Sequence, residues 1–457
     1  MDDSTTSQDN NNNNNEDDDD DDAFSSSGSS SSSSWRGWTC DELTPALCGL
    51  QRSEGTLTLR GNIDVHYWMY TAMFPPADEE TENAAAAQLP LVFVHGGPGL
   101  PHSYLLPLRQ QACRGRTVIF YDQAGCGASS IVPRKKKKEE ETTNQTINLQ
   151  EDYPWLLDPL YYATEELPAL LQHWGFDAYH IVGHAWGTMV AQLFALETKP
   201  APALASMTLL GGLSDMRLWE QAMWDPKTGS LGRLPPFLQR QVLFLQANEM
   251  YESSQYVALE QGLRRRFMCR TVPLPDCYIQ AQAGRNDEIS KALFGPSIFA
   301  NGGSMAHFNT TERLRTELAH VPVLLGASTF DIISPSVTTV LYDQLPLSEM
   351  FVCNKSGHVS AIDEPARTNG FITDFITRVE MARHHGRPFV PQRGVRPVDG
   401  DARTVNAWIS SWPFALVFVL SLVLGFALAR AILVMQIRKG YRRVGATTHA
   451  HSVLAAH

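Results

Sequence analysis

The sequence predicts an α/β fold in which helices cover both faces of a mostly parallel β-sheet. Six short runs rich in Val, Ile and Leu each lead into a glycine-rich or polar turn, and helical stretches separate several of them. Continuous apolar runs of this kind are typical of strands that are buried on both faces. The runs lie at residues 91–99, 117–127, 179–187, 205–212, 321–331 and 349–358.

Two segments between and after these runs have the apolar spacing of helices. Residues 186–200 place apolar side chains at intervals of three and four. In residues 363–386, Asp363 is expected to cap the helix, Pro365 suits its first turn and Gly386 can end it. Alternating strands and helices are what a sheet covered on both faces requires.

This core is predicted to be interrupted once and extended at both ends. A helix-rich stretch without strand patterns is expected to form a lid, and the Asn-, Asp- and Ser-rich N-terminal tract is expected to be disordered. The predicted parts are a tail at 1–34, the first part of the core at 50–212, the lid at 213–318, the second part of the core at 319–386, a linker at 387–411, a transmembrane helix at 412–437 and a basic tail at 438–457.

Negative charge is concentrated in the N-terminal tail. Residues 1–34 contain ten Asp and Glu side chains and neither Lys nor Arg, so they account for −10 of the net charge of −12 and leave −2 for the rest. A nearly neutral folded part lacks the basic surface that nucleic acids require. We therefore expect no nucleic-acid partner.

The cysteines do not indicate a metal or cofactor site. Seven are scattered along the chain, without a Cys-x-x-Cys pair or a histidine cluster at ligand spacing, and we predict neither a metal nor a cofactor. The odd number leaves at least one thiol free, and a reducing compartment is the simplest interpretation. Cys269 and Cys277 are close enough in the sequence to pair, but we expect them to be ordinary buried thiols.

A membrane span is predicted at residues 412–437. Residues 413–429 carry no charge, and after Arg430 the apolar sequence continues to residue 437. At 1.5 Å per residue this stretch can cross a hydrocarbon core of about 30 Å. Trp412 stands at one end and a basic cluster at 438–443 flanks the other, as is typical of membrane interfaces.

The sequence supports two orientations of this span. The basic flank favours a cytosolic C-terminus, and sequons at Asn144, Asn309 and Asn354 also favour a domain outside the cytosol. The acidic N-terminus, however, has none of the features of a signal peptide. Because a folded domain does not cross a membrane unaided, we expect a tail anchor with the domain in the cytosol, on the endoplasmic reticulum or on a mitochondrial or peroxisomal membrane.

Residues 183–187, Gly-His-Ala-Trp-Gly, have the glycines of a nucleophile turn without the nucleophile. In the pattern Gly-x-Ser-x-Gly, small residues let the chain turn sharply from a strand into a helix and expose the serine. Here Ala185 occupies the central position. Asp331 follows one later apolar run and His358 follows the next, which is the order of acid and base in α/β-hydrolases.

Two backbone N–H groups are predicted to form an oxyanion hole. One belongs to Trp186, directly after the nucleophile position, and the other to Gly97 in the glycine-rich turn "HGGPG" at 95–99. Such groups stabilise the negative charge that develops on a carbonyl oxygen during acyl transfer.

Three motifs together resemble the proline iminopeptidase branch of the α/β-hydrolases. They are "HGGPG" (95–99), "DQAGCGASS" (122–130) and "GHAWGT" (183–188), and the resemblance spans residues 50–385. It implies that Ala185 stands at the nucleophile position, that Asp331 is the acid and that His358 is the base. The segment "LFGPSIF" (293–299) resembles a family segment whose Glu helps to hold the free α-amino group of the substrate. Ile298 stands at that position.

The two departures, at Ala185 and Ile298, predict a membrane-anchored relative that is catalytically impaired and keeps a pocket for a peptide, a small amide or ester, or a partner protein. The enzyme status stays open, because an active aminopeptidase or hydrolase with another nucleophile, or with a serine misrecorded at 185, is the alternative. In a third interpretation the acidic tail is the functional part. Other nucleophiles within the motifs, namely Cys126, Thr188, Ser129 and Ser130, are expected to be structural.

Overall fold

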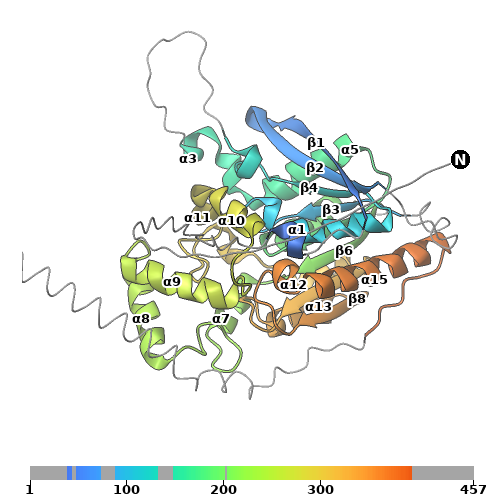
Figure 1. The fold of residues 1–457 in the computed structure, drawn as a ribbon. Helices are drawn as coiled ribbons and strands as arrows, with labels where there is room; N and C mark the ends of the chain where they lie inside the picture. Colours follow the sequence, from blue (N-terminus) through green and yellow to red (C-terminus); the bar gives the residue numbers. More distant parts are fainter. Residues whose placement is uncertain (1–38, 44–47, 74–87, 132–147, 201–202, 394–457) are drawn as a thin grey trace, which may run out of the picture. The chain divides into compact units, whose positions relative to one another are not determined.

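The computed structural model describes residues 39–43, 48–73, 88–131, 148–200 and 203–393, which form a domain around an eight-stranded sheet (Figure 1). The strand order is β1-β2-β4-β3-β5-β6-β7-β8, with antiparallel pairing of β2 to β1 and β4 and parallel pairing elsewhere. The strands are β1 (Leu50–Leu59), β2 (Ile63–Ala72), β3 (Leu91–Val94), β4 (Val118–Tyr121), β5 (Tyr179–His184), β6 (Leu204–Leu210), β7 (Val323–Ser328) and β8 (Ser348–Cys353).

The predicted α/β class with a mostly parallel sheet is confirmed, and each of the six apolar runs overlaps one of the strands β3 to β8, of which β6 and β8 begin one residue earlier than the run. The sequence does not predict β1 and β2. β1 lies at the edge of the sheet and exposes many of its side chains, so it lacks the apolar run that identifies a buried strand.

Side chains alternate along the central strands, so that each face of the sheet has its own core. In β3, Leu91 and Phe93 belong to one core, and Val92 and Val94 belong to the other. The first core is covered by η2 (His102–Arg114) and α15 (Pro365–His384), and the second by α5 (Leu167–Trp174), α6 (Trp186–Thr198) and α13 (Pro335–Gln344). Helices on both faces are thus confirmed.

One helix prediction needs correction. α15 begins at Pro365, and Gly386 adopts a φ of 60° just beyond its end, both as predicted. Asp363, however, does not cap this helix. It ends the short helix α14 (Ser360–Asp363), and its carboxylate accepts backbone hydrogen bonds from residues 270–271, more than 90 positions earlier in the chain. A tertiary contact therefore takes the place of the local cap.

The predicted helix-rich insertion lies between β6 and β7. Its helices are α7 (Met216–Met223), α8 (Pro236–Ala247), α9 (Ser254–Phe267), α10 (Asp276–Ala283), α11 (Asp287–Leu293) and α12 (Thr311–Glu317). The short helical segments are α1 (Cys40–Leu43), η1 (Arg60–Asn62), η3 (Gly127–Ser129), α3 (Leu149–Asp152), η4 (Pro154–Leu157), α4 (Pro159–Tyr161), η5 (Tyr162–Glu166) and η6 (Ser304–His307).

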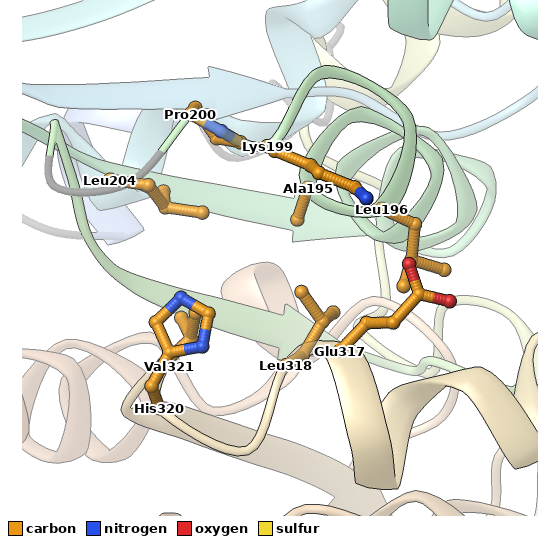
Figure 2. Close-up of a pocket in the computed structure, with 9 residues that line it drawn as sticks. All are labelled: Ala195, Leu196, Lys199, Pro200, Leu204, Glu317, Leu318, His320 and Val321. Atoms are coloured by element: carbon orange, nitrogen blue, oxygen red, sulfur yellow. The ribbon is translucent and has the colours of Figure 1, made fainter.

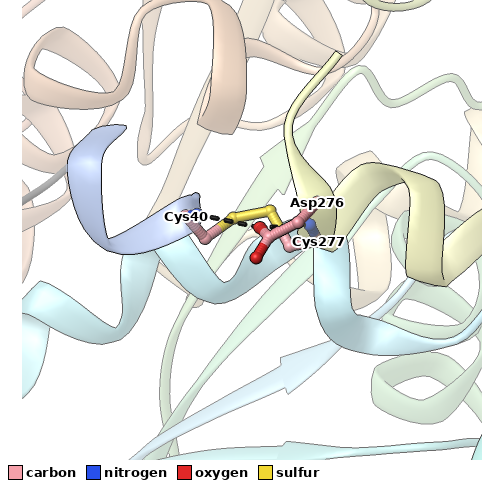
Figure 3. A group of neighbouring side chains, drawn as sticks. All are labelled: Cys40, Asp276 and Cys277. Atoms are coloured by element: carbon pink, nitrogen blue, oxygen red, sulfur yellow. Dashed lines mark hydrogen bonds between the residues drawn. A yellow bond between two sulfur atoms is a disulfide. The ribbon is translucent and has the colours of Figure 1, made fainter. Parts of the chain in front are cut away.

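Two disulfides correct the prediction for the cysteines. Cys277 is not a free thiol but is bonded to Cys40, with the Cα atoms 5.9 Å apart (Figure 3), and Cys48 is bonded to Cys113, with the Cα atoms 5.6 Å apart. The sequence separation of 237 residues explains why spacing alone did not indicate the first bridge. Cys269 is a buried thiol, as expected. In the described part of the chain, the one cluster of possible metal ligands consists of this first disulfide and Asp276, so its sulfurs are already bonded to each other.

The predicted membrane span at 412–437 lies outside the described residues, as do the tails at 1–34 and 438–457 and most of the linker at 387–411. Within the part that the structure describes, no helix has both the length and the apolar character needed to cross a bilayer.

Candidate active site

The turn between β5 and α6 holds Ala185 in the strained conformation of a nucleophile elbow. Its φ of 50° and ψ of −116° lie outside the regions that L-residues usually adopt. The flanking glycines are required by space: a Cβ atom on Gly183 would lie 2.5 Å from the carbonyl oxygen of Gly187, and one on Gly187 would collide with that of Val94. The backbone thus has the geometry of an elbow, and a methyl group stands at its centre.

Asp331 and His358 are brought together as a buried acid–base pair. Nδ1 of His358 lies 2.6 Å from Oδ1 of Asp331, which also accepts a 2.8 Å hydrogen bond from the backbone of Ile333. The pair lies against Gly211, where a Cβ atom would come within 3.1 Å of the imidazole and 3.2 Å of the carboxylate. Donation from Nδ1–H to the carboxylate leaves Nε2 as the proton acceptor, which is the tautomer that a general base requires.

The other half of the site is built by Gln123, which links the three sequence motifs. Its side chain accepts a 2.8 Å hydrogen bond from the indole of Trp186 and donates one of 3.1 Å to the carbonyl of His95, and its backbone N–H donates to His95 Nε2. Gly97, with a φ of 126°, lies in the same turn as His95. Trp186 is the first residue of α6, so its N–H has no acceptor within the helix. These contacts fix both predicted oxyanion-hole segments.

A second histidine, His184, lies behind the acid–base pair and was not indicated by the sequence motifs. Its Nε2 donates to the carbonyl of His358 (3.0 Å), so Nδ1 accepts from the hydroxyl of Tyr104 (2.8 Å), which in turn accepts from the backbone of Gly96 (2.7 Å). Burial lowers the pKa of His184 to about 3 and keeps it neutral. This chain of bonds ties the base to the glycine-rich turn, a role that only the tertiary structure reveals.

Comparison with known proteins identifies the family. The profile of the α/β-hydrolase fold matches residues 90–365. The chain is 31% identical over 291 residues to a proline iminopeptidase of Heyndrickxia coagulans, with coverage of 64% of this chain and 91% of that one. The chain belongs to the α/β-hydrolase family, in its proline iminopeptidase-like branch. It is also 29% identical to a proline iminopeptidase of Clostridium botulinum, over 60% of this chain and 85% of that one.

Two solved structures agree with this chain in fold. The proline iminopeptidase of Mycobacterium smegmatis has a TM-score of 0.60 at 24% identity, covering 72% of this chain and 100% of that one. VinJ has a TM-score of 0.56 at the same identity, covering 71% and 98%. At this level of identity the likeness supports the fold.

Four of the predicted site residues of this α/β-hydrolase line one cavity of about 50 Å³. Ala185, His358, Gly97 and Ile298 all line it, and Arg264, Met268 and Tyr278 of the helical insertion complete one wall. An adjoining cavity of about 110 Å³ shares part of this lining, including Gly97 and Ile298. The position that resembles the family's amine-binding Glu, Ile298, therefore lines the same cavity as Ala185, but with a hydrocarbon side chain.

The other nucleophiles considered within the motifs have structural roles. Cys126 is buried, and burial raises the pKa of its thiol well above the usual value. Thr188 Oγ1 donates a 2.6 Å hydrogen bond to the carbonyl of Ala185, and Ser129 Oγ donates one of 2.7 Å to the carbonyl of Asp122. Ser130 is an exposed residue of the turn. The one serine hydroxyl among the described residues that line the 50 Å³ cavity belongs to Ser290, outside the motifs.

A further cavity, of about 180 Å³, lies elsewhere. Figure 2 shows its lining residues at the end of α6, the start of β6 and the segment that leads from α12 to β7, among them Lys199, Leu204 and His320. These are the amino ends of parallel strands, whereas ligands of open α/β sheets bind at the carboxyl ends. The site at Ala185 lies at the carboxyl ends of the strands. The acid–base pair is therefore at the end of the sheet where ligands of such folds bind.

Proposed function

We propose that this chain is a catalytically impaired proline iminopeptidase-like hydrolase that binds a small peptide, amide or ester without turning it over at an enzymatic rate. The observation that carries the proposal is the preserved elbow, acid–base pair and glycine-rich turn around the methyl group of Ala185. Covalent acyl transfer requires a nucleophilic atom at this position. A pocket whose remaining parts are in place can still bind.

The test combines reactivity with binding, both on the full chain. We expect no covalent labelling by a fluorophosphonate probe, which requires an activated nucleophile, and no release of p-nitroaniline from aminoacyl p-nitroanilides. Small amides should nevertheless protect the protein against thermal unfolding, because a ligand that binds only the folded state stabilises it. Labelling or turnover at an enzymatic rate would contradict the proposal.

An active hydrolase with a different nucleophile is the second candidate, and Ser290 is the observation that favours it. Ser290 on α11 lines the same cavity as His358, which is the predicted base. In that case fluorophosphonate would label the chain, and Ser290→Ala would abolish labelling. Labelling that survives this substitution would exclude Ser290.

The proposal includes attachment to a membrane through residues 412–437. The support is the apolar sequence flanked by Trp412 and by the basic cluster at 438–443. We expect the full chain to stay with membranes after alkaline extraction and a chain lacking residues 412–457 to be released. Release of both would refute the anchor.

A further inference from the structure

The cavity beside Ala185 has an unusual charge for a site related to aminopeptidases. Two arginines, Arg264 on α9 and Arg285 between α10 and α11, line it together with His358. No Asp or Glu is found among the described residues of its lining. Asp331 is not part of this lining, and its Oδ1 is hydrogen-bonded to the imidazole of His358.

Ile298 removes the group that would attract a free amine. In the segment that it resembles, a Glu helps to hold the α-amino group of the substrate, whereas here an isobutyl-sized hydrocarbon lines both adjoining cavities. A protonated amine in this space would lose its hydration and meet guanidinium groups. Burying a charge without a partner is strongly unfavourable.

The two carboxylates that line the adjoining cavity are each paired with an arginine. Glu260 lines the outer cavity, but one oxygen pairs with Arg264 at 2.6 Å and the other accepts a 2.7 Å hydrogen bond from Ser297. Asp287 pairs with Arg285 at 2.5 Å, and its side chain is 63% exposed to solvent. Neither offers an uncompensated negative charge to a ligand. The same pairs compensate the charges of the two arginines, and Lys291 of the outer lining pairs with Glu252 at 3.2 Å. The inner cavity therefore offers a carboxylate the remaining N–H donors of two guanidinium groups, and no competing acid among the described residues that line it.

We propose that the site binds a small ligand with an apolar body and a carboxylate group, and not a peptide with a free amino terminus. The apolar body lies against Met268 and Ile298, and the carboxylate faces the planar donor groups of Arg264 and Arg285. This assignment deepens the proposed function and rests on it. It specifies the charge of the preferred ligand, and this preference can be measured by binding, separately from turnover.

Three compounds with the same side chain test the charge preference. N-acetyl-leucine carries only a carboxylate, leucinamide only a free amine, and N-acetyl-leucinamide neither. With the full chain in mild detergent, ligand-detected NMR titrations should show N-acetyl-leucine binding at least about tenfold more tightly than the neutral compound, and leucinamide more weakly than either. Tightest binding of leucinamide, equal binding of all three, or no detectable binding of any would overturn the proposal.

Arg285→Gln is the decisive variant, because it removes a guanidinium whose partner Asp287 is already well solvated. It should reduce the preference for N-acetyl-leucine to nearly that for the neutral compound, whereas Arg240→Gln, on the exposed surface of α8, should leave it unchanged. An unchanged preference in Arg285→Gln would overturn the proposal. Turnover of any aminoacyl substrate would instead refute the proposed lack of catalysis and leave the charge preference to be decided by the titrations.

The disulfides independently carry a second inference. Cys40–Cys277 and Cys48–Cys113 fasten the described N-terminal segment to the domain, and the backbone N–H of Cys40 donates a 2.9 Å hydrogen bond to Asp276 beside the first bridge (Figure 3). The three other cysteines, Cys126, Cys269 and Cys353, are all buried. Paired cysteines together with shielded thiols are typical of proteins that fold in an oxidising environment.

We infer that the domain folds in the oxidising lumen of the secretory pathway and stays on the side of the membrane away from the cytosol. The disulfides weigh against the cytosolic placement that the sequence favoured, and the basic cluster at 438–443 then lies on the cytosolic side, as the positive-inside rule requires. The sequon at Asn354 fits this orientation, because this residue is exposed just after β8.

Thiol counting decides the compartment. The chain is isolated from the cells that make it with thiols trapped at lysis, denatured, and treated with a polyethylene-glycol maleimide before or after reduction. We expect three adducts before reduction and seven after it, since four of the seven cysteines are bonded. Cys40→Ser should add one adduct before reduction by freeing Cys277, and Cys269→Ser should remove one. Seven adducts without reduction would overturn the inference.

Discussion

Replacing Ala185 with serine is expected to create an active hydrolase. The elbow already has the strained backbone that a serine would need, with a φ of 50° and flanking glycines that fit only without side chains. The substitution adds one hydroxyl to a residue that is 8% exposed at the edge of the cavity. Because the strain is present before the change, we expect an unfolding free energy within about 1 kcal/mol of that of the unsubstituted chain.

The size of the gain follows from the state of the acid–base pair. In a serine protease, loss of the serine lowers kcat about 2 × 10⁶-fold, and a base held in the wrong tautomer costs about 10⁴-fold. The 2.6 Å contact between His358 and Asp331 fixes the productive tautomer, so the second loss should not apply here. Ala185→Ser is therefore expected to raise the rate by about 10⁴- to 10⁶-fold, and a misoriented pair would allow only about 200-fold.

Hydrolysis of p-nitrophenyl acetate measures this gain, because the ester is small and uncharged and does not depend on the residue at 298. Labelling by fluorophosphonate provides a second readout. The double variant Ala185→Ser/His358→Ala is the control and should return to the level of the unsubstituted chain. A rise smaller than about 200-fold in a variant with an unchanged melting temperature would refute the claim that the acid–base pair is catalytically oriented.

Three further predictions concern the support of the site. In the serine variant, Asp331→Asn should lower kcat by about 10⁴-fold, because the base loses the carboxylate that sets its tautomer; a loss below tenfold in a kinetic assay would argue against that role. Gly187→Ala should cost more than about 3 kcal/mol in urea unfolding, because its Cβ would collide with the last carbonyl of β3. Gly262→Ala within α9, where the added Cβ meets open space, should be neutral or stabilising; equal effects would contradict the packing. Burial raises the pKa of Glu166 to about 8, so its stabilising contribution is complete below its ordinary value of 4.5 and is lost as the pH rises through 8. Between pH 5 and pH 8 the ionisation of Glu166 should lower the free energy of unfolding by roughly 3 kcal/mol. Glu166→Gln should abolish this loss and flatten the profile of melting temperature against pH, whereas Glu165→Gln on the exposed side should not.

The sequence motifs located the candidate active site because each motif reflects a local requirement of the backbone. Glycines at 183 and 187 are needed wherever a strand turns this sharply into a helix, and the order of Ala185, Asp331 and His358 follows from the order of the strands that carry them. The motifs did not reveal His184 and Tyr104 as links between the base and the glycine-rich turn. Those links depend on side-chain directions set by packing, which spacing along the chain does not contain.

What the sequence determined by itself is the fold class, the elbow with Ala185 at its centre, and the family, because buried strands and sharp turns demand particular residues at fixed positions. The tertiary structure decided the pairing of Cys40 with Cys277, the position of Asp363 and the meeting of Arg264, Arg285 and Ile298 in one cavity. Each of these joins segments from separate parts of the chain. Their physical effect depends on distance and burial in space, and neither can be read from residue order.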